Sequence, residues 1–162
     1  MKSAFACLAM FLFTCVPLLQ AGTPTCEITA YCYAMPVRDL SDFLLTCNPA
    51  GQAELGKSQI EKWVSEKKAM FVGMLSTKGE SCARLKADGK DFDLETESVV
   101  SEDGNTLDII SSVMLPDQQV ASCVTSRKNQ FVFAGNSTPG AQPSNSKLKV
   151  YLVYLQAKVS NQ

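Results

Sequence analysis

FDLETESVVSEDGNTLDIISSVML, residues 92–115, is a run in which two kinds of side chain alternate with a period of two. The apolar or small side chains of this run are Phe92, Leu94, Thr96, Ser98 and Val100, followed by Leu107, Ile109, Ser111, Val113 and Leu115. Successive side chains of a strand point to opposite faces, so this period is typical of a strand with one buried face. Asp103-Gly104 lies between the two halves and suits the backbone angles of a hairpin turn. The run therefore predicts two antiparallel strands joined by a tight turn.

Two further segments are apolar on both of their alternating faces, namely Glu27–Met35 and Leu148–Val159. A strand of this kind is typically covered on both sides. An exposed edge strand as apolar as Leu148–Val159 would invite aggregation. We therefore expect Glu27–Met35 to be covered on both faces and Leu148–Val159 to be a central strand.

The remaining patterns predict shorter strands and two helices. The strands are expected over residues 69–76, 81–86, 119–126 and 130–134, the last two forming a hairpin. One helix is expected over about residues 58–68, with Ser58 and Glu61 as a capping box, and a shorter helix over about residues 39–46. The fold class is therefore α+β and β-dominated: a single sandwich-like domain of seven or eight mostly antiparallel strands.

The first 21 residues have the composition of a secretory signal. Lys2 is followed by the apolar run Ala4–Leu19, and Ala21 precedes the expected cleavage site. We predict a signal peptide over residues 1–21 and one exported domain over residues 22–162, periplasmic or extracellular. The apolar run is short for a membrane-spanning helix, so we expect no span after cleavage. Retention of the segment as an anchor is the alternative.

Five cysteines follow the predicted signal peptide. An oxidising compartment favours disulfides, and five cysteines allow two bonds with one thiol left over. The candidate disulfide cysteines are Cys26, Cys47, Cys82 and Cys123, and Cys32 is the candidate free thiol. Their pairing is left open by the sequence. A bond that closed a loop as long as 82–123 would stabilise the fold by about 3–4 kcal/mol in the chain-entropy model.

The sequence holds few of the residues on which catalysis depends. It has no histidine, which excludes the side chain most used as a general base and metal ligand. Its net charge of −1 gives no reason to expect nucleic acid as a partner. Carboxylates gather at Asp91, Asp93, Glu95 and Glu97, and without calcium-loop spacing we interpret them as a solvated strand face. We predict no catalytic residue, no cofactor and no metal.

Four segments follow one another in an order similar to that of a known family. They are Leu75–Ala83, Phe92–Ile110, Gln130–Gly135 and Lys147–Leu155. With their strands, glycine turns and closing apolar strand, they resemble the C-terminal β-domain of bacterial secretins of type II and III secretion, over about residues 69–157. The resemblance implies a shared β-domain architecture. The family's ring-building N-terminal domains have no counterpart here, so the resemblance does not imply a secretion pore.

Three functions are compatible with these observations. The first is a non-enzymatic exported protein that binds another protein or a component of the cell envelope. The second is a self-assembling subunit of a secretion-related envelope complex, in which the fifth cysteine can form an intermolecular bond. The third is a hydrolase that uses paired Asp and Glu side chains. We favour the first because the carboxylates lie on predicted strands, where solvation is their ordinary role.

Overall fold

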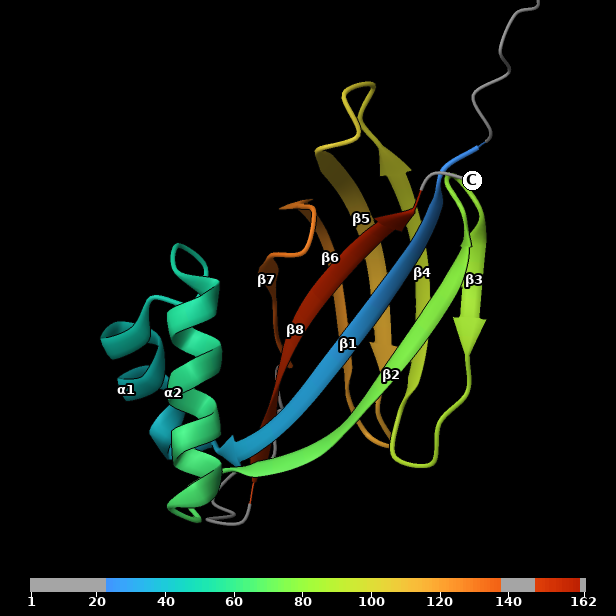
Figure 1. The fold of residues 1–162 in the computed structure, drawn as a ribbon. Helices are drawn as coiled ribbons and strands as arrows, with labels where there is room; N and C mark the ends of the chain where they lie inside the picture. Colours follow the sequence, from blue (N-terminus) through green and yellow to red (C-terminus); the bar gives the residue numbers. More distant parts are fainter. Residues whose placement is uncertain (1–22, 138–147, 161–162) are drawn as a thin grey trace, which may run out of the picture.

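The computed structural model describes residues 23–137 and 148–160, and in this part of the chain it contains two helices and eight strands (Figure 1). In chain order these are β1 (Thr25–Pro36), α1 (Val37–Cys47), α2 (Ala53–Ser65), β2 (Met70–Glu80), β3 (Arg84–Ala87), β4 (Asp93–Val100), β5 (Thr106–Met114), β6 (Gln119–Arg127), β7 (Phe131–Asn136) and β8 (Lys149–Ser160). The predicted signal peptide lies outside the described residues.

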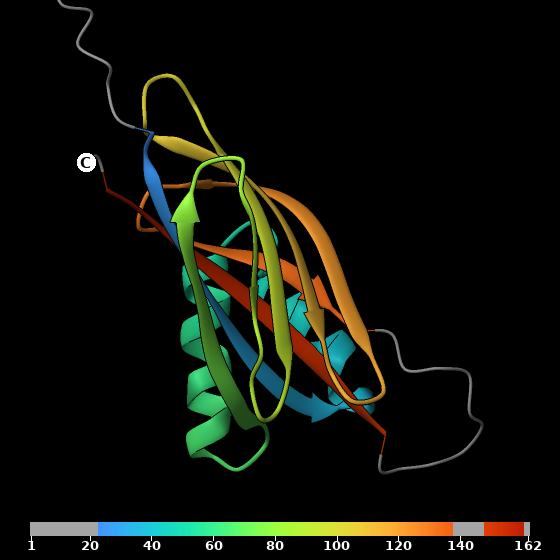
Figure 2. The ribbon, with the colours of Figure 1, turned by 90° about the vertical axis from the view of Figure 1, so that its right-hand side faces the viewer.

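The strands form two antiparallel sheets of four. Sheet A has the order β2-β1-β8-β7, and sheet B has the order β3-β4-β5-β6. The two sheets face each other, and both helices lie on the side of sheet A that faces away from sheet B (Figures 1 and 2). The predicted β-dominated fold with mostly antiparallel strands is therefore confirmed.

The core between the sheets is built by the period of two seen in the sequence. Strands β4 and β5 pair in register from Asp93 opposite Met114 to Val100 opposite Leu107. Their inward side chains meet those of β1 and β8. The fully buried members from β4, β5, β1 and β8 include Leu94, Leu107, Ile109, Val113, Ile28, Ala30, Val153 and Leu155. The predicted hairpin and its buried face are thus confirmed.

Hydroxyl groups within this core satisfy one another. Thr77 of β2 and Thr96 of β4 form a buried hydrogen bond between the sheets, with an Oγ1–Oγ1 distance of 2.7 Å. Ser111 of β5 and Ser122 of β6 are joined by an Oγ–Oγ hydrogen bond of 2.8 Å. A buried hydroxyl is costly without a partner, so these pairs allow polar residues on an otherwise apolar face.

Strands β6 and β7 do not form the predicted hairpin. They follow each other closely in the chain, but β6 belongs to sheet B and β7 to sheet A. In the turn between them, Asn129 has a φ of 65° and its N–H donates to the carbonyl of Ala157 on β8 over 2.8 Å. This bond joins the turn to sheet A at the point where the chain changes sheets. The chain also changes sheets between β2 and β3.

Strands β1 and β8 are covered on both faces, as the sequence predicts. They pair over their full length, from Thr25 opposite Ser160 to Pro36 opposite Lys149. One face packs against sheet B, and the other packs against the helices through a second core that includes Tyr33, Leu152 and Tyr154. Strand β8 lies between β1 and β7, so its predicted central position is confirmed.

The helices confirm the expected elements but correct both boundaries of α2, which ends at Ser65 and not near Lys68. Helix α1 spans the predicted short helix and ends where Asn48 adopts a left-handed conformation with φ 41°. Helix α2 starts at Ala53, five residues before the predicted start at Ser58. Ser58 is exposed within the helix, and Gln52 precedes the first turn without a side-chain cap, so the predicted capping box is wrong.

The first half of α2 is placed by a close contact with β8. A Cβ atom on Gly56 would lie 2.8 Å from the Tyr154 hydroxyl and 2.8 Å from Cβ of Pro49. The glycine therefore lets the helix approach the buried tyrosine ring. Within the described residues the Tyr154 hydroxyl has no hydrogen-bond partner, and burial raises its pKa.

Replacing Tyr154 by phenylalanine should leave the free energy of unfolding unchanged or raise it by up to about 1 kcal/mol, because the buried hydroxyl is unpaired. As a control, Tyr33→Phe removes a 3.3 Å hydrogen bond to Glu61 and should lower this free energy by roughly 0.5–1.5 kcal/mol. Urea unfolding measures both. A loss of more than about 1 kcal/mol in Tyr154→Phe would show that the hydroxyl has a partner.

Two neighbouring isoleucines test which face of sheet B is buried. Ile109 is fully buried and Ile110 is exposed on the opposite face. Ile109→Ala should lower the free energy of unfolding by about 2–5 kcal/mol, because it leaves a cavity in the core. Ile110→Ala should change it by no more than about 0.5 kcal/mol. Equal losses measured by urea unfolding would contradict the observed alternation.

Candidate functional site

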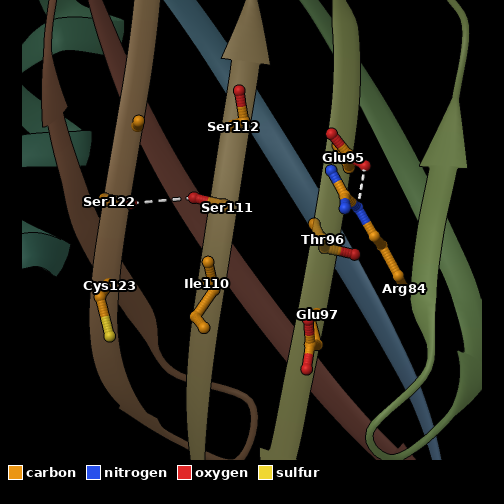
Figure 3. A pocket seen from close by; sticks show the side chains of 10 residues that line it. Arg84, Glu95, Thr96, Glu97, Ile110, Ser111, Ser112, Ser122 and Cys123 are labelled. Atoms are coloured by element: carbon orange, nitrogen blue, oxygen red, sulfur yellow. Dashed lines mark hydrogen bonds and ion pairs between the residues drawn. The ribbon is translucent and has the colours of Figure 1, made fainter.

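The outward face of sheet B is hollowed into an open concavity of about 540 Å³ (Figure 3). Strands β3 to β6 all contribute to it. Its outward-pointing side chains are Arg84, Glu95, Glu97, Ile110, Ser112, Ala121 and Cys123. We call this set the sheet-B face.

The registers of the strands place four unlike side chains in one row across the sheet-B face. Arg84 lies opposite Glu97, Glu97 opposite Ile110, and Ile110 opposite Cys123. The inward face takes most of the apolar residues, but Ile110 remains 56% exposed in the middle of this row. The row was not predicted from the sequence, although the predicted turn at Asp103-Gly104 already placed Glu97 near Ile110. An exposed apolar centre beside charged groups is a suitable surface for binding.

The charges on the sheet-B face are partly paired. Arg84 forms an ion pair with Glu95, visible as a dashed line in Figure 3. The hydrogen bond from Arg84, aided by its charge, lowers the pKa of Glu95, and the same contact raises the pKa of Arg84. Glu97, the next outward residue of β4, makes no ion pair within the described residues. This carboxylate is therefore available to a partner.

The acidic residues are arranged for charge pairing more than for proton transfer. A general acid near neutral pH needs a carboxyl whose pKa is raised, whereas the pKa of Glu95 is lowered. By linkage, the contribution of this pair to stability is present above the ordinary pKa of glutamate and is lost as the pH falls through the lowered value.

Among the residues that the structure describes, no group of three or more Cys, Asp or Glu could hold a metal ion.

The cysteines do not form the disulfides that were expected from the sequence. All five in the described part of the chain are free, so the expected disulfides among Cys26, Cys47, Cys82 and Cys123 are not formed. Cys26 packs between the sheets, whereas Cys47 packs between the helices and sheet A. Three strand spacings, roughly 14 Å, separate the β3 edge beside Cys82 from Cys123, and a disulfide needs Cα atoms within about 7 Å. Cys32, the candidate free thiol, is free as well.

Comparisons with family models, curated proteins and solved structures found no match to this chain. The resemblance to the secretin β-domain therefore stays a prediction. Within residues 23–137 and 148–160, neither helix has the length and apolar character needed to cross a membrane.

Thiol labelling tests the arrangement of the cysteines. In folded protein at pH 8, iodoacetamide should modify Cys82 and Cys123, which are exposed. Cys32 should be protected, because burial removes access and raises its pKa to about 12. In urea without reductant, all five cysteines of residues 26–123 should react, as counted by mass spectrometry. Fewer than five adducts after unfolding would reveal a disulfide.

Proposed function

We propose that this chain is a non-enzymatic exported protein that binds another protein through the sheet-B face. The observation that carries the proposal is the exposed Ile110, set between the free carboxylate of Glu97 and the thiol of Cys123. Val99 and Met114 are further exposed apolar side chains on β4 and β5. Export is supported by the apolar N-terminal run behind Lys2.

The chemistry of the sheet-B face defines the kind of partner. A partner should present an apolar side chain to Ile110 and a lysine or arginine to Glu97. Arg84 and Glu95 are already paired with each other, so they favour the correct orientation more than they add affinity. One carboxylate without an ion pair beside a small apolar centre thus favours a protein surface that presents a positive charge at that position.

The lowered pKa of Glu95 supports a non-enzymatic role over the hydrolase alternative. A glycoside hydrolase needs one protonated and one ionised carboxyl on either side of its substrate. Arg84 holds Glu95 in its ionised form, and the outward carboxylates of β4 lie on an open face. The carboxylates therefore serve recognition in this proposal.

Substituting aspartate for Ile110 should weaken partner binding by at least about 10-fold, because it removes an apolar contact that the partner would bury and introduces a charge. The matched control is Leu45→Asp, since Leu45 is 85% exposed on α1, away from sheet B. Each mature chain is immobilised and incubated with extracellular and envelope fractions. The same species should bind wild type and Leu45→Asp but not Ile110→Asp.

Retention of that species by Ile110→Asp at wild-type levels would contradict the proposal. Size-exclusion chromatography of the purified chain distinguishes self-assembly from binding of a different protein. If the partner is a second copy, wild type should elute as an oligomer and Ile110→Asp as a monomer.

A further inference from the structure

A second pocket lies on the other side of the molecule, between α2 and the outward face of sheet A. It has a volume of about 270 Å³ and is open to solvent. Its lining residues are Tyr31, Tyr33, Glu61, Val64 and Phe71. Three aromatic rings and one carboxylate are the combination that proteins use to hold organic cations. We call this site the aromatic pocket.

The chain already places one of its own cations on the same surface. The Lys57 side chain is only 13% exposed, and its Nζ lies 5.0 Å from the ring centroid of Tyr31 and 4.5 Å from that of Phe131. Lys57 also donates to Glu61 over 2.5 Å. The outward face of sheet A therefore stabilises a nearly buried ammonium with aromatic faces and a carboxylate.

The aromatic pocket repeats these elements beside Lys57, which does not line it. The rings of Tyr33 and Phe71 are 5.3 Å apart and tilted by 54°. The Tyr33 hydroxyl donates to Glu61 over 3.3 Å and so orients the carboxylate. Phe71 is 45% exposed, which leaves its ring accessible at the mouth of the pocket.

We infer that the aromatic pocket binds a quaternary ammonium group of the choline type. A primary ammonium is strongly hydrated and needs several hydrogen-bond acceptors, and Oε1 of Glu61, the one carboxylate among the lining residues, already accepts hydrogen bonds from Lys57 and Tyr33. A trimethylammonium group has no N–H to satisfy. Its methyl groups contact the accessible rings of Tyr31 and Phe71, and its charge is attracted to these rings. The carboxylate of Glu61 offsets the repulsion from the neighbouring ammonium of Lys57.

Calorimetric titration of the full mature chain with choline chloride tests this inference. Choline should show saturable binding at least about 5-fold tighter than 3,3-dimethylbutan-1-ol, its neutral isostere. Equal affinity for the neutral alcohol would overturn the inference, because the pocket would then recognise only apolar shape. Absence of saturable choline binding would overturn it as well.

Two substitutions locate the binding site. Phe71→Ala should weaken choline binding by about 2- to 30-fold, the range expected for one cation–π contact. Glu61→Gln should weaken choline binding without changing that of the neutral alcohol. Leu55→Ala is the control, since Leu55 is 53% exposed on α2 and does not line the pocket.

Circular dichroism first confirms that each variant is folded. Folded Phe71→Ala with the affinity of Leu55→Ala would overturn the inference. Phosphatidylcholine vesicles then identify the source of the group. Retention on these vesicles and not on phosphatidylglycerol vesicles indicates a lipid headgroup, and binding of free choline alone indicates a soluble ligand.

Discussion

The ladder between β1 and β8 brings the two ends of the described chain together and is buried on both faces. Each strand has twelve residues, so a long apolar surface must be covered from two directions at once. Sheet B covers one face, and the two helices cover part of the other. This double coverage accounts for the layered arrangement, because neither layer alone would remove both faces of the ladder from water.

The same arrangement leaves two outward faces of different chemistry. Sheet B contributes only its inward side chains to the core, so its other face is free to carry ion pairs and the exposed Ile110. On sheet A, the helices stop short of the whole face, and aromatic rings remain accessible beside Glu61. The two proposed binding surfaces lie on opposite sides of one core, so a protein partner and a small cation would not compete for the same space.

Local patterns predicted the parts of the fold that depend on local chemistry. The period of two over residues 92–115 defined the β4–β5 hairpin, and the two-faced β8 was recognisable as a central strand. The change of sheet between β6 and β7 was not predictable, because the turn there is bonded through Asn129 to the distant Ala157. The first half of α2 likewise lies against a residue far along the chain, since Gly56 packs beside Tyr154.

The candidate sites were harder to predict than the fold. Arg84 and Glu95 are eleven residues apart and meet through the pairing of β3 with β4. The register of that pairing cannot be derived from the sequence. The aromatic pocket combines β1, α2 and β2, so no short motif marks it. The cysteines gave a misleading signal, because their number suggested pairs while their positions place them on different faces.

Hydrogen exchange of the backbone amides tests the central role of the β1–β8 ladder most directly. Amides whose strands are buried on both faces should exchange only through global unfolding. We predict that the amides of Ala30 and Leu155, which lie opposite each other in this ladder, are among the slowest and exchange with the free energy of global unfolding. Faster exchange of both than of Ile109 on β5 would contradict it, because the β4–β5 hairpin would then be the more stable unit.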